Sequence, residues 1–171
     1  MSHSIRHPTL GDAAGVLALM SACDVANLGR PDSTLDQVLE ELNDPDIMLD
    51  TDAWLAVDER DEICGFGVVY LQGDGDIVEM DVYVHPRAEP VLYAVLWDAA
   101  EGRAQEFGRA KGHRELRLDT GVHRGDERTR AEISRRGFTP ATVFYRMRID
   151  HQDVVPRPEL PPGVTIVTVG D

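Results

Sequence analysis

Apolar residues recur at helical spacing in two stretches near the N-terminus. The first stretch follows Asp12, a residue type that caps helices, and it ends in the 27–31 segment. Its apolar positions are Val16, Leu17, Leu19 and Met20. The second stretch opens at Ser33. Its apolar positions are Leu35, Val38, Leu39 and Leu42. The pattern predicts helices over about 12–26 and 33–42, each with one apolar face that packs against the rest of the domain.

After residue 52 the period of the apolar positions changes to two. Runs at 53–57, 63–71 and 77–84 are separated by short polar turns, which predicts three strands of an antiparallel meander. In the third run Val78, Met80, Val82 and Val84 alternate with Glu79, Asp81 and Tyr83. One face of this strand therefore belongs to the core, and the other carries carboxylates.

The second half of the chain alternates helical and extended patterns. A long apolar stripe runs from Pro90 to Gly108, a short strand pattern covers 116–118, a charged helical pattern covers 126–136, and an alternating run covers 142–149. The predicted fold class is α/β, with a mixed, mostly antiparallel central sheet and helices on both faces.

The last residues differ from the rest. Pro156, Pro158, Pro161 and Pro162 disfavour regular pairing and predict an extended linker. The 163–171 segment then repeats the start of the chain, because both contain a strand pattern followed by Thr, an apolar residue, Gly and Asp. We predict one domain over 1–153, and a linker over 154–171 that includes the possible first strand of a truncated second domain. That strand, 164–169, could pair with another molecule's sheet edge.

Charge and cysteine content narrow the function. The formal net charge of −14 repels phosphate backbones, so we expect no nucleic-acid partner. No apolar run reaches the roughly 20 residues of a membrane span, which predicts no membrane partner and a cytoplasmic location. Cys23 and Cys64 match no metal spacing and are predicted to be buried, reduced thiols, and the histidines show no metal spacing either.

The element order, the Val84-His85-Pro86 strand end before a long helix, and the charged helix that ends in Gly137-Phe138 resemble the GNAT superfamily of acyl-CoA-dependent N-acyltransferases. The resemblance spans residues 4–149. It implies transfer of an acetyl group from acetyl-CoA to a primary amine of a small molecule or peptide. It also implies that acyl-CoA lies where the third strand opens away from its parallel neighbour, with the pyrophosphate on loop amides at a helix N-terminus. The implied cofactor contacts are Val82, Tyr83, Val84, Glu89, Val91, Leu92, Tyr93, Ala94, Asp126 and Thr129.

The loop and the second motif depart from the family pattern. In HPRAEPVLYAVL, Glu89 replaces Arg or Gln, Leu92 replaces a glycine, and only Ala94 fits. Pro90 also offers no amide hydrogen. In DERTRAEISRRGF, Asp126 replaces Asn, Thr129 replaces Ala, and Ile133 replaces the tyrosine that often protonates the thiolate in this family. These departures predict weak acetyl-CoA binding or none, because a carboxylate repels the pyrophosphate and bulk prevents close approach.

An N-acyltransferase needs a base that takes the proton of the amine. Glu79 and Asp81 are the candidate catalytic residues, and the alternative is that both are solvent-facing carboxylates of a half-exposed strand.

Three functions stay open at this point. The domain is an active N-acetyltransferase, or a catalytically silent half of a tandem protein like mycothiol synthase that packs against or regulates an active half, or a small-molecule sensor or scaffold. The partners expected are an amine substrate and a second GNAT domain or a second copy of the chain.

Overall fold

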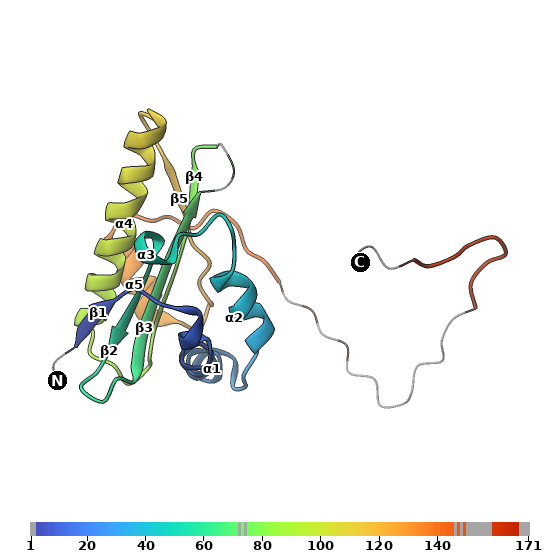
Figure 1. The fold of residues 1–171 in the computed structure, drawn as a ribbon, viewed down its shortest axis with the longest axis horizontal. Helices are drawn as coiled ribbons and strands as arrows, with labels where there is room; N and C mark the ends of the chain where they lie inside the picture. Colours follow the sequence, from blue (N-terminus) through green and yellow to red (C-terminus); the bar gives the residue numbers. More distant parts are fainter. Residues whose placement is uncertain are drawn as a thin grey trace. The chain divides into compact units, whose positions relative to one another are not determined.

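The computed structural model describes residues 3–71, 73, 75–145, 147, 149 and 159–167. The chain divides into two units, Met1–Phe138 and Thr139–Asp171. Every helix and strand of the described residues lies in the first unit (Figure 1).

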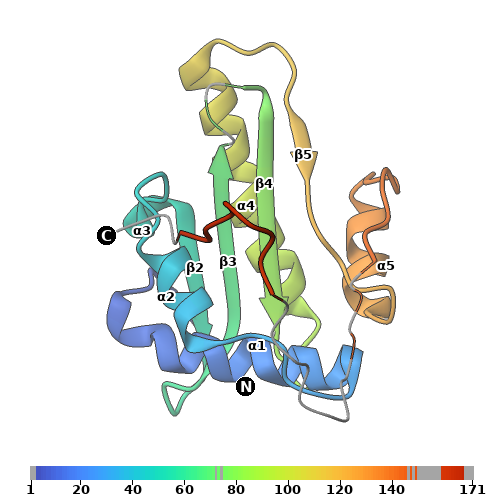
Figure 2. The same ribbon diagram turned by 90° about the vertical axis from the view of Figure 1, so that its right-hand side faces the viewer.

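The first unit is built on a sheet of strand order β1-β2-β3-β4-β5. The strands are β1 (Ser4–Arg6), β2 (Ala53–Val57), β3 (Ile63–Leu71), β4 (Ile77–Val84) and β5 (Arg117–Asp119). Neighbours from β1 to β4 are antiparallel, whereas β4 and β5 are parallel and are joined through a long helix (Figure 2). The predicted mixed, mostly antiparallel sheet is confirmed, and β2, β3 and β4 occupy the residues predicted for them.

Helices cover both faces of the sheet (Figure 1). They are the 3-10 turn η1 (Leu10–Asp12) and the helices α1 (Ala13–Leu28), α2 (Leu35–Leu42), α3 (Leu49–Asp52), α4 (Val91–Lys111) and α5 (Glu127–Arg135). The short α3 was not predicted. Side chains of α1 and α2 form one apolar core with β2 and β3, and α4 forms a second core on the opposite face, around the fully buried Trp97.

The strand β4 contributes side chains to both cores, because successive side chains point to opposite faces of the sheet. Val78 and Met80 are fully buried on the α4 face, while Tyr83 packs against the core of α1 and α2. The carboxylates Glu79 and Asp81 share the face of Tyr83, so they point toward the helical pair and not toward α4.

The connection between α1 and α2 is anchored by a buried acid. Asp24 is 5% exposed, and its carboxylate accepts hydrogen bonds from the backbone N–H groups of Asp32 and Ser33 and from the Ser33 hydroxyl. Thr34 then caps α2 by accepting from the N–H of Gln37. These bonds fix where α2 begins relative to α1.

The prediction of a strand over 142–149 is wrong for those residues of the range that the structure describes. Residues 142–145, 147 and 149 have no strand structure, and their apolar side chains are exposed, with Phe144 at 92%. Alternation makes a segment fit for a strand, but a strand forms only when its backbone groups find partners.

The C-terminal strand predicted over 164–169 is likewise absent over 164–167, where Ile166 is 71% exposed. Residues 168–169 and most of the predicted linker lie outside the described residues. The boundary at residue 153, the linker and the internal repeat stay predictions.

Candidate functional site

The strands β4 and β5 are paired over only part of the length of β4. The paired residues run from Ile77 and Arg117 to Glu79 and Asp119, and β4 then continues to Val84 without a β5 partner. Figure 2 shows the chain after β5 leaving β4 and running toward α5. We call the side of the second half of β4 that has no β5 partner the opening.

The backbone of β4 presents polar groups to this opening. The N–H of His85 donates to the carbonyl of Cys64 on the β3 side. Because alternate residues of an antiparallel strand direct their N–H and C=O groups to opposite sides, the peptide groups of Val82 and Val84 face the β5 side. Their side chains are buried, so it is their backbone groups that line the opening.

A cavity of 210 Å³ lies at the end of β4. It lies between the end of α1, the end of β4 and the starts of α4 and α5. Its lining residues are Cys23, Ala26, Asn27, Val84, Pro86, Tyr93, Gly125, Asp126, Glu127 and Arg128. Val84, Tyr93 and Asp126, three of the ten residues assigned to the cofactor from the sequence, meet here.

The start of α5 is organised by Asp126. Its carboxylate accepts from the N–H of Thr129 at 2.9 Å and from the Thr129 hydroxyl at 2.8 Å, which caps the helix. Thr129 is 6% exposed, and its side chain is hydrogen-bonded to that of Tyr93. Burial raises the pKa of Tyr93, so its hydroxyl stays protonated at neutral pH.

Two contacts cross the end of the opening. The thiol of Cys23 donates to the carbonyl of Val84 at 3.5 Å, and burial raises the pKa of this thiol to about 12. Arg128 Nη1 donates to the carbonyl of Pro86 at 2.9 Å, which links α5 to the loop between β4 and α4. The sequence pattern placed Arg128 on a charged helix face and did not indicate that it reaches this loop.

The loop between β4 and α4 holds the remaining predicted cofactor residues. Leu92 is 2% exposed and packs in the core under α4, so its bulk is not presented at the loop surface, contrary to expectation. Val91 is 55% exposed, Pro90 stands at the N-cap of α4, and Glu89 is half-buried. Ala94 lies one turn into the helix, where its carbonyl accepts from Arg136 Nη2.

Carboxylates gather on the other face of β4. We call Glu41 of α2 and Glu79 and Asp81 of β4 the acidic cluster. Burial, followed by the charge of Glu79, raises the pKa of Asp81 to about 6. Burial, followed by the charges of Asp81 and Asp44, raises the pKa of Glu41 to about 7. These shifts mark Glu41 and Asp81 as desolvated, and both Glu79 and Asp81 are half-buried. The catalytic roles of Glu79 and Asp81, and the alternative of solvent-facing carboxylates for Glu79, stay predictions.

Two tyrosines accompany the acidic cluster. Tyr70 on β3 donates a hydrogen bond to Glu79, and Tyr83 follows Asp81 on the same face of β4. Burial and the neighbouring carboxylates raise the pKa of both phenols. The sequence did not indicate Glu41 or Tyr70, because they approach β4 only through the packing of α2 and the pairing of β3.

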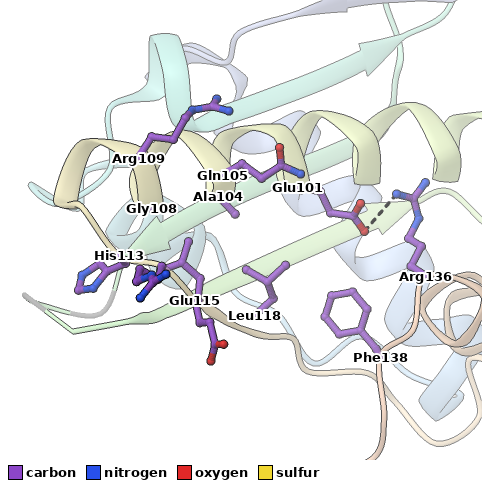
Figure 3. A pocket seen from close by; sticks show the side chains of 12 residues that line it. Glu101, Ala104, Gln105, Gly108, Arg109, His113, Glu115, Leu118, Arg136 and Phe138 are labelled. Carbon is purple, nitrogen blue, oxygen red and sulfur yellow. Dashed lines mark ion pairs between the residues drawn. The ribbon is translucent and has the colours of Figure 1, made fainter.

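A larger cavity, of 490 Å³, lies between the second half of α4 and β5 (Figure 3). Its floor contains Ala104, Leu118 and Phe138, and its rim contains the ion pair of Arg136 with Glu101 at 3.2 Å. It shares no lining residue with the smaller cavity and contains none of the residues assigned to catalysis or cofactor from the sequence.

The described residues form neither a metal-binding cluster nor a membrane-spanning helix. No group of three or more His, Cys, Asp or Glu side chains among them could hold a metal ion. None of the helices described is long and apolar enough to cross a membrane.

No protein-family model and no curated protein matches the sequence, but solved structures do. A GCN5-related N-acetyltransferase from Sphaerobacter thermophilus is 21% identical with a TM-score of 0.72, and the match covers 81% of this chain and 44% of that one. A ribosomal-protein-alanine N-acetyltransferase from Brucella melitensis biovar Abortus 2308 is 21% identical with a TM-score of 0.59, over 87% of this chain and 100% of that one. A putative acetyltransferase from Salmonella typhimurium, solved with acetyl-CoA, is 19% identical with a TM-score of 0.58, over 83% and 82%.

The chain thus spans less than half of the Sphaerobacter protein and the whole of the Brucella one. These likenesses, with a mixed sheet whose parallel strands part beside a helix N-terminus, show that the chain has the fold of the GNAT superfamily, the GCN5-related N-acetyltransferases.

Proposed function

We propose that this domain is an acyl-CoA-dependent N-acyltransferase that moves an acetyl group from acetyl-CoA to a primary amine. The observation that supports it most is that Glu79 and Asp81 of the acidic cluster lie on β4, the same strand whose backbone borders the opening toward β5. A thioester held along the opening and an amine at the acidic cluster would approach each other across one strand.

The residues around the opening fit an acyl-CoA in most respects. The peptide groups of Val82 and Val84 can pair with the amides of its pantetheine arm, and the N-terminus of the 21-residue α4 favours anions. Arg128 supplies a cation beside the loop. The carboxylate of Glu89 repels a pyrophosphate, and Pro90 removes one amide donor. We therefore expect this loop to bind acetyl-CoA more weakly than a loop with Arg at position 89 and Gly at position 92 would.

Asp81 is the proposed base. Its pKa of about 6 leaves it mostly ionised at pH 7.5 and makes it a stronger base than an ordinary aspartate. Asp81 takes the proton that the amine nitrogen releases as the new N–C bond forms and the C–S bond breaks. Glu79 is the second candidate, and its carboxylate is held by Tyr70.

The departing thiolate takes its proton from water in this scheme. Ile133, at the position of the family's tyrosine, packs against the core on the α4 face and has no proton to give. A thiol with an ordinary pKa of about 8.5 is mostly protonated at neutral pH without a dedicated acid.

The test is release of free thiol from acetyl-CoA in the presence of an amine. We expect amine-dependent release by the wild type and a loss of roughly 10²-fold in Asp81→Asn, the usual size of a general-base contribution. Asp36→Asn, at an exposed position of α2, is the control and should leave the rate unchanged. A folded protein that binds acetyl-CoA but releases no thiol with any amine would contradict the proposal.

A second candidate function is that of a catalytically silent domain in a larger protein. Two observations favour it: the contacts of Cys23 with Val84 and of Arg128 with Pro86 narrow the end of the opening, and the Sphaerobacter protein is more than twice as long as the region matched here. A silent domain would not bind acetyl-CoA, whereas an enzyme must.

A further inference from the structure

The indole N–H of Trp97 is buried without a hydrogen-bond partner among the described residues. Trp97 lies on α4, its exposed fraction is 0%, and within the part of the chain that the structure describes its Nε1 finds no acceptor. Native proteins pair nearly all of their buried donors, because a donor removed from water loses a hydrogen bond that nothing replaces. The position of Trp97 therefore suits an acceptor that comes from another molecule.

A water molecule is a poor acceptor at this position. A buried water is held by about two to four polar groups. Trp97 lies instead in the core on the α4 face, with apolar side chains such as Met80, Leu96 and Ala100. The aromatic ring beside it, that of Phe138, is a weak acceptor compared with an oxygen atom. The acceptor that fits is an oxygen carried by a largely apolar molecule.

The larger cavity reaches this position through Phe138. Phe138 lines the cavity of 490 Å³ (Figure 3), and its ring centroid lies 5.8 Å from that of Trp97 with the planes 62° apart. Glu101 and Ala104, which also line the cavity, follow Trp97 on α4 by one and two turns, so all three share a helix face. The volume falls within the roughly 300–1,000 Å³ of small-molecule sites.

The side chain of Phe138 has room to turn. Its backbone is fixed, because its N–H donates to the carbonyl of Ile133 at 3.0 Å. Its ring is half-buried and lies beyond Arg135, the last residue of α5, with the cavity on one side. A rotation about the side-chain torsions moves the ring without moving α5.

The charges at this end of the cavity favour a neutral oxygen. Arg136 has three carboxylate partners, Asp98 at 2.8 Å, Glu101 at 3.2 Å and Glu132 at 2.6 Å. One guanidinium among three carboxylates leaves a net negative charge, which repels an anion. A carbonyl oxygen accepts a hydrogen bond without adding a charge.

We propose that the larger cavity binds a small, largely apolar molecule with a carbonyl oxygen, such as an aryl ketone. The ring of Phe138 turns aside, and the oxygen accepts the hydrogen bond of Trp97 Nε1–H. Ala104 and Leu118 on the cavity floor contact the apolar body. This site stands apart from the proposed acyltransferase, because the two cavities share no lining residue.

The experiment is an NMR titration of the isotope-labelled whole chain. The chain has two tryptophans, so Trp54→Phe assigns the indole N–H signal of Trp97. The probes are acetophenone and ethylbenzene, which has the same carbon skeleton with CH₂ in place of the carbonyl group. We expect acetophenone to move the Trp97 indole proton signal downfield until it saturates, and to bind about 5-fold more tightly than ethylbenzene, the ratio that one net hydrogen bond gives.

Three variants locate the site, and their affinities are measured from the signals of the probes. Trp97→Phe removes the donor and should lower acetophenone affinity about 5-fold, to that of ethylbenzene. Leu118→Phe takes up space on the cavity floor and should weaken both probes about 10-fold. Leu71→Phe makes the same change at a half-buried position of β3 outside the cavity lining, and should alter neither affinity.

Three results would overturn the ketone site. They are a Trp97 signal that does not respond to acetophenone up to its solubility, equal shifts and affinities for the two probes, and equal effects of Leu118→Phe and Leu71→Phe. If Trp97→Phe does not melt cooperatively, the wild-type signal and the two leucine variants decide. None of these results depends on acetyl-CoA, so the ketone site and the acyltransferase can fail separately.

Discussion

The hydroxyl of Tyr70 donates a hydrogen bond to the carboxylate of Glu79, the residue directly opposite it in the ladder of β3 and β4. Asp81, two residues further along the same face, has no such donor among the described residues. Two carboxylates that look equivalent in the sequence therefore have different surroundings, and burial raises the pKa of Asp81 to about 6.

The two carboxylates should differ in kinetics. We expect Asp81→Asn to lower kcat by roughly 10²-fold and Glu79→Gln by less than 10-fold, since a base held by a phenol is less free to take a proton. The ratio of wild-type to Asp81→Asn rates should be larger at pH 7.5 than at pH 5, where Asp81 is protonated. Equal losses in both variants at both pH values would indicate a general electrostatic effect and no specific base.

Glu41 should make stability depend on pH. Its pKa of about 7 in the folded state exceeds its ordinary value, so the folded state binds more protons than the unfolded state between about pH 4.5 and 7. Its contribution therefore favours folding at low pH and is lost as the pH rises to 7. Glu41→Gln should raise the free energy of unfolding at pH 8 by on the order of 1–3 kcal/mol and flatten this dependence.

The check is urea unfolding of both proteins at several pH values between 5 and 8. Glu40→Gln should follow the wild type throughout, because Glu40 is exposed. If the free energy of unfolding changes with pH in the same way for wild type and Glu41→Gln, Glu41 is solvated in solution.

Asp24 should stabilise the fold through the connection that leads to α2. Asp24→Ala removes the acceptor of three hydrogen bonds at a site that is 5% exposed, and we expect a loss of about 2–4 kcal/mol in the free energy of unfolding. Asp36→Ala, in the exposed first turn of α2, should cost less than about 1 kcal/mol. Similar losses for both would mean that the Asp24 bonds do not persist in solution.

Local pattern was sufficient for much of the fold. The alternation of Val78 to Val84 predicted which face of β4 is core, and the turns predicted where β2 and β3 end. The 142–149 run was predicted as a strand from the same alternation and is not one in its described residues. The difference is pairing, because the meander strands bring their own neighbours by short turns and the later run does not.

The sequence could predict those residues of the candidate site that lie together on a single strand. Glu79 and Asp81 follow from the period of β4. Glu41 and Arg128 are brought to β4 and to the Pro86 carbonyl by packing between segments that are far apart in sequence, which periodicity does not encode. Leu92 was misplaced because counting along a family motif gives a position and not the direction of the side chain.

Arg128 should contribute to cofactor binding. We expect Arg128→Ala to weaken acetyl-CoA binding about 10-fold and to reduce its dependence on salt, because a guanidinium beside the loop attracts phosphate. Arg130→Ala is the matched control, since Arg130 is an exposed residue of the same helix whose guanidinium donates to the Arg124 carbonyl. Titration calorimetry at two salt concentrations would show the difference, and equal effects of the two substitutions would remove Arg128 from the site.

Calorimetric titration of acetyl-CoA into the whole wild-type chain tests the central claim most directly. If the opening beside β4 holds an acyl-CoA, the titration will saturate at one molecule per chain, and Glu89→Arg will tighten binding because it replaces a repulsive charge with an attractive one at the loop. Absence of binding at millimolar acetyl-CoA, by a wild type that melts cooperatively and by Glu89→Arg alike, would contradict the acyltransferase and leave the silent domain.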